Sequence, residues 1–225
     1  MHTVTGQVLE LILEDERRYI RVVCPVSMIP APGQYLLASD GSDSPLPVPL
    51  FYTDSAPQGF VAALPLTAAW SPGIALHLRG PLGRGFNLPL AARRVGLVAY
   101  DDTSARLRGL IRPALKKDAA VVMVSSTTTE NLPDDVEVQP PSVLDDILEW
   151  ADYVAFDVAR ENLPRLRERL AKRNQLSAGL GAQVLIRTAI PCGGIAECGV
   201  CAVTLKSDWK LACKDGPVFD WRELD

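Results

Sequence analysis

The chain has 225 residues, of which 48% are hydrophobic and 22% are charged, and its formal net charge is −4. This length allows one or two domains with a substantial core, and the charge gives no reason to expect nucleic acid or an anionic membrane surface as a partner. No apolar run approaches the roughly 18 residues that a spanning helix needs. We therefore expect a cytoplasmic protein with no nucleic-acid or membrane partner.

The first 92 residues carry the pattern of a small β-domain. Apolar and polar residues alternate over 3–24 around the turn-like segment 14–16, which predicts a hairpin. Cys24 ends this hairpin and is interpreted as a small buried hydrophobe. Prolines then separate the short apolar runs 34–38, 48–53, 59–64 and 74–79. Many short strands between turn residues predict a closed or sandwiched antiparallel domain.

A glycine-rich loop, GPLGRGF, occupies residues 80–86. Its glycines and proline predict a tight turn with unusual backbone angles. Arg79 precedes the loop and could either assist an anion or be a surface strand residue.

From residue 95 the period changes to alternating strands and helices. Strands are expected at 95–100, 119–124 and 152–158, and helices at 103–116, 142–150 and 160–173. Such alternation predicts βαβ units around a mostly parallel sheet.

The turn after the first of these strands reads Ala99-Tyr100-Asp101-Asp102-Thr103-Ser104. A dinucleotide-binding turn needs glycines, so that a pyrophosphate can approach a helix N-terminus. Here side-chain bulk and negative charge both oppose a phosphate, so NAD(P) binding is not expected. Thr103 or Asp102 is better interpreted as a helix N-cap.

Four of the five cysteines lie near the end of the chain, at Cys192, Cys198, Cys201 and Cys213, with the spacing C-x5-C-x2-C-x11-C. Structural zinc sites usually bring two C-x2-C pairs, and only one is present. A disulfide framework suits small secreted proteins, and we detect no signal segment. The plant-type [2Fe–2S] pattern, C-x4-C-x2-C with a distant fourth cysteine, differs by one residue.

Glycines around these cysteines favour the cluster. Gly193, Gly194 and Gly199 leave room for backbone N–H groups to approach the sulfur atoms. We predict that the four cysteines hold a [2Fe–2S] cluster, with structural zinc as the alternative.

The segments CGGIAECGVCAV and WKLACKDGPVFD resemble the cluster domain of the electron-transfer subunit of class B dihydroorotate dehydrogenases, a ferredoxin-reductase-like family. Upstream, the segment 32–35 (PGQY) resembles the family's PGQF, and 80–86 resembles its GPLGNGF. The resemblance implies three parts: a flavin-reductase-like β-barrel at 1–92, an α/β nucleotide-binding-like domain at 93–189, and a [2Fe–2S] domain at 190–225.

For FAD, the resemblance implies Tyr52 and Thr53 on a barrel strand as flavin contacts, together with Gly80, Gly83 and Gly85 of the glycine loop. Leu50 stands where the family has an arginine for the pyrophosphate, and a bidentate guanidinium is hard to replace there. The segment 64–73 keeps Thr67 but lacks the family's phosphate-turn glycines. FAD therefore stays an open question.

The resemblance also implies an accessory electron-transfer subunit. It would relay electrons to or from a flavoprotein dehydrogenase similar to dihydroorotate dehydrogenase, in a hetero-oligomer linked to pyrimidine biosynthesis. The alternatives are a FAD-containing NAD(P)H reductase subunit and a non-redox scaffold with structural zinc.

Overall fold

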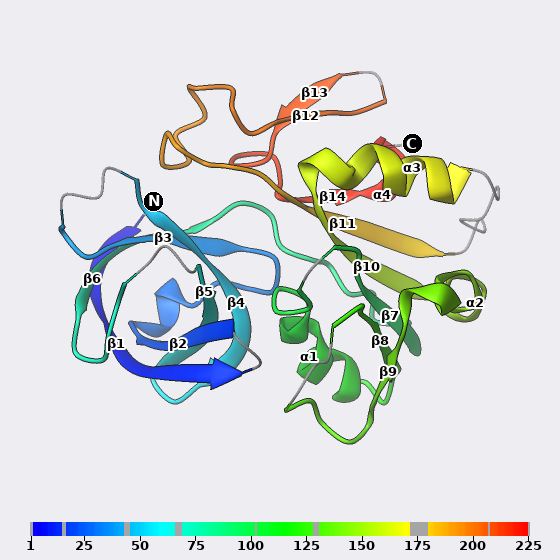
Figure 1. The fold of residues 1–225 in the computed structure, drawn as a ribbon, viewed down its shortest axis with the longest axis horizontal. Helices are drawn as coiled ribbons and strands as arrows, with labels where there is room; N and C mark the ends of the chain where they lie inside the picture. The colour runs from blue at the N-terminus through cyan, green and yellow to red at the C-terminus, as the bar shows by residue number, and fades with distance from the viewer. Residues whose placement is uncertain are drawn as a thin grey trace.

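The computed structural model of the chain describes residues 2–14, 17–42, 46–65, 69–101, 103–127, 131–171, 180–206 and 208–224. A β-barrel and an α/β sheet lie side by side, and the C-terminal segment runs along one end of both (Figure 1). This is the expected fold class. No helix within the described ranges is long and apolar enough to cross a membrane.

The N-terminal half is a closed antiparallel barrel with strand order β1-β2-β5-β4-β3-β6. Its strands are β1 (His2–Glu14), β2 (Arg17–Val23), β3 (Tyr35–Ser39), β4 (Val48–Ala56), β5 (Gly59–Leu64) and β6 (Ala75–Leu82), with a 3-10 helix η1 (Val26–Met28). Alternate residues such as Ile20, Leu36 and Phe60 face inward and are fully buried. Cys24 joins this core and is 7% exposed, as expected for a small hydrophobe, and burial raises the pKa of its thiol to about 11.

The second half is a six-stranded sheet with order β14-β11-β10-β7-β8-β9, parallel except for β14. The central strand β10 is buried along its whole length, as both faces of a covered parallel sheet require. The strands are β7 (Arg94–Ala99), β8 (Ala120–Val124), β9 (Val136–Gln139), β10 (Tyr153–Ala159), β11 (Gly181–Arg187) and β14 (Val218–Asp220). The helices are η2 (Arg108–Leu110), α1 (Ile111–Leu115), η3 (Pro141–Val143), α2 (Leu144–Trp150), η4 (Arg160–Asn162), α3 (Leu163–Ala171) and α4 (Trp221–Leu224).

The helix expected over 103–116 is much shorter in the structure. A turn over 105–107 and the 3-10 helix η2 lead into α1, which begins only at Ile111. Thr103 does accept a hydrogen bond from the Ala105 amide at 3.2 Å, but it stabilises this turn and not an α-helix. Asp102, the other expected cap, lies outside the described residues. Pro113 explains part of the difference, because α1 places it in the first helical turn, where proline is tolerated, whereas a helix beginning at 103 would place it in the interior.

The C-terminal segment is tied into the sheet. After the cysteine loop, β12 (Ala202–Thr204) pairs with β13 (Trp209–Leu211), and β14 then adds to the edge of β11. Cys201 and Cys213 belong to the same hydrophobic cluster as Phe156 and Trp221. The division at residue 190 stays a prediction, and the structure adds that both sides of it share one core.

Candidate functional site: a cysteine loop beside a cationic cleft

The four C-terminal cysteines lie in and beside the loop 191–201, at the end of the molecule where the C-terminal segment meets the barrel (Figure 1). Cys201 and Cys213 are buried, Cys192 is partly buried and Cys198 is exposed. The loop turns through left-handed backbone angles at Gly193 (φ +64°), Gly194 (+73°), Ala196 (+64°) and Gly199 (+69°). Three of the four positions are glycine, the residue that adopts these angles without a steric penalty.

Hydrogen bonds join the cysteines as two pairs. Burial opposes ionisation of Cys192, but the Cys198 thiol and the amides of Cys198, Glu197 and Ala196 donate to its sulfur and lower its pKa to about 6. In the second pair, burial, a hydrogen bond to Cys201 and the nearby negative charges raise the pKa of Cys213 to about 12. The Ala196 amide also bonds to Cys213, so one backbone donor reaches both pairs.

The two pairs lie close enough together for the charge of Cys192 to affect Cys213. Across the described ranges, no three His, Cys, Asp or Glu side chains are grouped as ligands of a single metal ion. A tetrahedral zinc site needs four ligands around one centre. A two-iron cluster instead distributes its four cysteine ligands over two irons, which suits two adjacent pairs and the amide donors around Cys192.

Two barrel residues lie against this loop. The buried Tyr35 hydroxyl donates to the Cys213 carbonyl at 3.2 Å. Burial raises the pKa of Tyr35, the thiols of Cys213, Cys201 and Cys192 raise it further as they ionise, and Arg79 lowers it. Sequence reasoning placed Tyr35 in a motif but gave its hydroxyl no role, because the contact joins residues 178 positions apart.

The glycine loop 80–86 forms a joint between the barrel and the C-terminal segment. The Arg84 amide donates to the Gly216 carbonyl at 2.5 Å, and the Phe86 amide donates to Pro32 at 2.8 Å. A Cβ at Gly83 would lie 2.6 Å from the Gly216 oxygen, and one at Gly85 would lie 2.6 Å from the Pro32 oxygen. These glycines therefore permit close backbone contacts of the loop 80–86 with the barrel and with the C-terminal segment.

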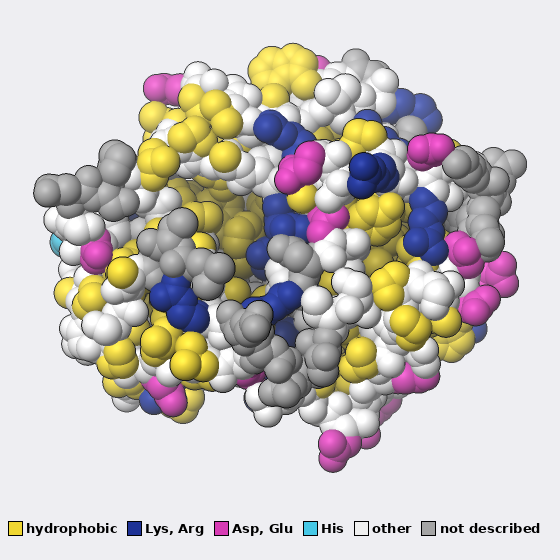
Figure 2. All heavy atoms as spheres, in the orientation of Figure 1, with side chains coloured by type: hydrophobic (Ala, Val, Ile, Leu, Met, Phe, Trp, Pro, Cys, Tyr) yellow, Lys and Arg dark blue, Asp and Glu magenta, His cyan; other side chains and the backbone are white. Residues whose placement is uncertain are grey.

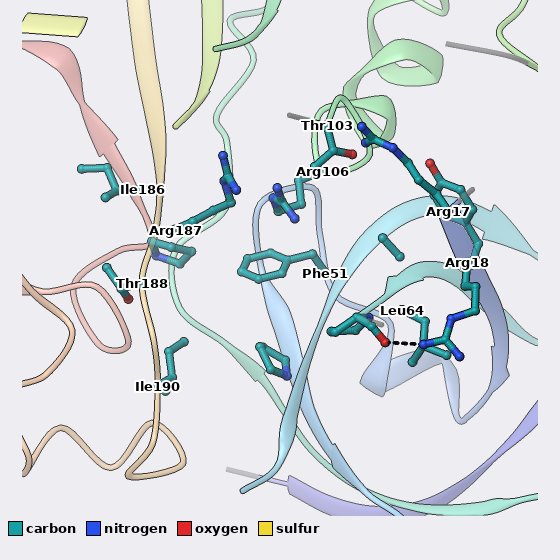
Figure 3. Close-up of a pocket in the computed structure, with 15 residues that line it drawn as sticks. Arg17, Arg18, Phe51, Leu64, Thr103, Arg106, Ile186, Arg187, Thr188 and Ile190 are labelled. Atoms are coloured by element: carbon teal, nitrogen blue, oxygen red, sulfur yellow. Dashed lines mark hydrogen bonds between the residues drawn. The ribbon is translucent and has the colours of Figure 1, made fainter. Parts of the chain in front are cut away.

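A cleft of about 450 Å³ opens between the barrel and the sheet, and Figure 2 shows the hollow with hydrophobic and cationic side chains in it. Figure 3 shows Arg106 and Arg187 entering it from the sheet side, near the Phe51 ring, with Arg17 and Arg18 on β2 at the other side. The Arg106 guanidinium lies 5.9 Å from the centre of the Phe51 ring. The cleft thus combines an aromatic surface with four arginines, a combination that the sequence pattern did not reveal.

The flavin residues expected from the sequence lie outside the lining of this cleft. Pro49 and Phe51 line it, whereas Tyr52 on the next position stacks against Phe60 at 6.3 Å. Thr53 is buried, with 1% exposed. Because successive strand residues point to opposite faces, the alternate positions 49 and 51 face the cleft. Gly80, Gly83 and Gly85 do not line it either.

A network of ion pairs lies at the carboxyl ends of the central parallel strands. Asp157 has no exposed surface and binds Arg106 at 2.7 Å and Arg187 at 2.9 Å. Asp101 binds Arg187 at 2.5 Å, and it accepts hydrogen bonds from the Ala159 amide at 2.5 Å and from the Asn162 side chain at 2.7 Å. The carboxylate that follows β7 is therefore committed to partners within the protein.

Comparisons with known proteins agree with these features. Residues 191–225 match the model of the iron-sulfur cluster binding domain of dihydroorotate dehydrogenase B. A search of curated proteins gives no match.

The fold is shared with solved reductases. An NADH-dependent reduced ferredoxin-NADP oxidoreductase is 17% identical, with a TM-score of 0.76 over 98% of this chain and 89% of that chain. The cytochrome P450 reductase GcoB of Amycolatopsis is 15% identical, with a TM-score of 0.60 over 83% and 70%. A ferredoxin NADP+ reductase from Neisseria gonorrhoeae, solved with bound FAD and NADP, is 10% identical, with a TM-score of 0.57 over 81% and 98%. The chain therefore has the fold of the ferredoxin reductases, and its residues 191–225 match the iron-sulfur cluster binding domain of dihydroorotate dehydrogenase B, as the sequence resemblance predicted.

Proposed function

We propose that this protein is an electron-transfer subunit in which Cys192, Cys198, Cys201 and Cys213 hold a [2Fe–2S] cluster. The observation that carries the proposal is the arrangement of the four cysteines as two adjacent pairs, with backbone amides donating to Cys192. Such a cluster accepts and releases one electron at a time, at a potential set by hydrogen bonds and solvent access. The loop supplies the hydrogen bonds, and the barrel covers one side.

The cysteine loop is also suited to meet a partner protein. It exposes Ile195 (50%) and Val200 (42%), which lie in the same loop as the partly exposed Cys192. Exposed apolar side chains around a functional group are typical of protein–protein contacts. We propose a flavoprotein dehydrogenase similar to dihydroorotate dehydrogenase as the partner, in a hetero-oligomer.

The cluster proposal is tested by analysis of anaerobically purified protein for iron, zinc and sulfide, with visible spectra before and after dithionite. We expect two irons per chain and absorption that bleaches on reduction. Cys201→Ser should lose the iron, whereas Cys24→Ser, in the barrel core, should retain it. A colourless protein with one zinc per chain would refute the cluster and favour the structural-zinc alternative.

The cleft supports a second proposal, that a flavin such as FAD binds between the barrel and the sheet. Phe51 offers an aromatic surface, and Arg17, Arg18 and Arg106 offer positive charge for phosphate. These arginines would replace the cation that is missing at Leu50.

A nicotinamide dinucleotide is not proposed as a substrate. Asp101 occupies the end of β7 with its own partners, and its negative charge opposes a pyrophosphate there. We expect the isolated chain to give no NADH-dependent reduction of a dye. Robust NADH turnover would instead support the alternative of an NAD(P)H reductase subunit.

A further inference from the structure

Arg79 is a cation on the barrel wall that faces the cysteine loop. It lies on β6, where it pairs with Thr3 of β1 and Leu37 of β3. The Cβ that a side chain would add at Gly193 lies 3.1 Å from Nη2 of Arg79, and Gly193 directly follows Cys192. The absence of a side chain at Gly193 therefore lets the guanidinium lie directly against the loop.

The Nη2 group of Arg79 is buried and has no hydrogen-bond partner among the described residues. Leaving a buried charged donor unsatisfied is costly, because water no longer solvates it. Tyr35 lies close enough for the Arg79 charge to affect its hydroxyl, and its own hydroxyl bonds to the Cys213 carbonyl. The unpaired donor is thus located on the side of the barrel that contacts the cysteines.

The charge of the proposed cluster supplies the missing partner. Four thiolates and two sulfides leave an oxidised [2Fe–2S] centre with a net charge of about −2, and reduction adds one further negative charge. A nearby cation stabilises both forms but stabilises the reduced form more, since the interaction scales with the charge. A cation at this position therefore favours the reduced state.

We propose that Arg79 is the counter-ion of the cluster and raises its reduction potential, which makes the cluster a better electron acceptor. This inference rests on the proposed cluster at Cys192, Cys198, Cys201 and Cys213. Arg79 acts as a positioning and electrostatic residue, and no bond to iron is required of it. The sequence alone left Arg79 open between an anion-binding and a surface role, because Gly193 lies far from it along the chain.

The test is a dithionite redox titration of the purified full-length protein, followed by electron paramagnetic resonance of the reduced cluster. Arg79→Gln should make the reduced state about tenfold less favourable, which for a one-electron couple is a potential lower by about 59 mV. Arg79→Lys keeps the charge and should stay close to the wild-type potential. Dithionite supplies the electron in every sample.

Arg21→Gln is the matched control, because it removes the same charge from a barrel strand. Arg21 pairs with Glu10, further along β1 than the Thr3 that pairs with Arg79. The cluster in Arg21→Gln should have the same reduction potential as the cluster in the wild type.

The outcomes separate the two proposals. A wild-type protein without iron would overturn the proposed function. If the wild-type protein holds the cluster and Arg79→Gln has the same reduction potential as the wild type, the role of Arg79 is overturned. An equal fall of the potential in Arg21→Gln would also overturn it. If Arg79→Gln fails to assemble the cluster, assembly by Arg79→Lys at close to the wild-type potential supports the role, because the positive charge is then what the site requires. Failure of Arg79→Lys to assemble the cluster overturns the role, because the shape of arginine and not its charge is then required.

Discussion

The Tyr35 hydroxyl of the barrel donates a hydrogen bond to the Cys213 carbonyl at 3.2 Å, and both residues are buried. This contact ties the first half of the chain to the last of the four cysteines. The resembled family has phenylalanine at the end of this motif, whereas Tyr35 adds a hydroxyl that reaches the cysteine site.

Tyr35→Phe should weaken the attachment of the cysteine segment to the barrel. Loss of one buried hydrogen bond should lower the free energy of unfolding by about 1 kcal/mol, and iron should be released faster to a chelator. Tyr153→Phe is the matched control, since it removes a 2.7 Å hydrogen bond to Gln183 within the sheet. It should cost similar stability without faster iron release, and equal release from both variants would contradict the role of Tyr35.

Asp157→Asn should destabilise the protein strongly. The change leaves Arg106 and Arg187 without their shared buried carboxylate, and breaking such a pair costs about 3–5 kcal/mol. Denaturant unfolding measures the loss. Glu10→Gln, which breaks an exposed 3.5 Å pair with Arg21, should change stability by less than about 1 kcal/mol. Similar values for the two variants would show that the network contributes no more than a surface pair.

Gly83→Ala should disturb the joint between the barrel and the C-terminal segment. Gly83 has φ +73°, and a Cβ there would lie 2.6 Å from the Gly216 oxygen. Gly73→Ala separates the two effects, because Gly73 has φ +92° with no atom within 4 Å of an added Cβ. The Gly73 variant should lose about 1 kcal/mol of stability from backbone strain alone. The Gly83 variant should lose clearly more stability than the Gly73 variant. An equal loss would mean that the backbone around Gly83 and Gly216 shifts to accommodate the added Cβ.

Ala63→Trp should fill part of the cleft and prevent flavin binding. Ala63 lies on β5 and lines the cleft, whereas Ala75 is exposed on β6 outside it. Titration with FAD, followed by quenching of flavin fluorescence, measures the effect. Wild type and Ala75→Trp should bind FAD with the same affinity, and Ala63→Trp should bind it at least tenfold more weakly. Undiminished binding by Ala63→Trp would place the flavin elsewhere.

The sequence alone predicted most of the elements and the iron-sulfur character of the C-terminal segment. The hairpin over 3–24 and the strands of the barrel follow from local alternation, and the parallel strands from short apolar runs, because these patterns depend on near neighbours. The cysteine spacing identified the iron-sulfur domain in the same way. The helix expected over 103–116 was too long, because proline is tolerated in the first turn of a helix but not in its interior, and Pro113 therefore favours a helix that begins near Ile111.

The tertiary structure decided which side chains meet. Phe51 and not Tyr52 faces the cleft, because the orientation of β4 in the barrel selects one set of alternate residues. Arg79 meets Gly193, Tyr35 meets Cys213, and Asp157 joins two arginines from different elements. Each of these contacts joins residues more than 25 positions apart, and local sequence patterns carry no information about the chain crossings that bring them together.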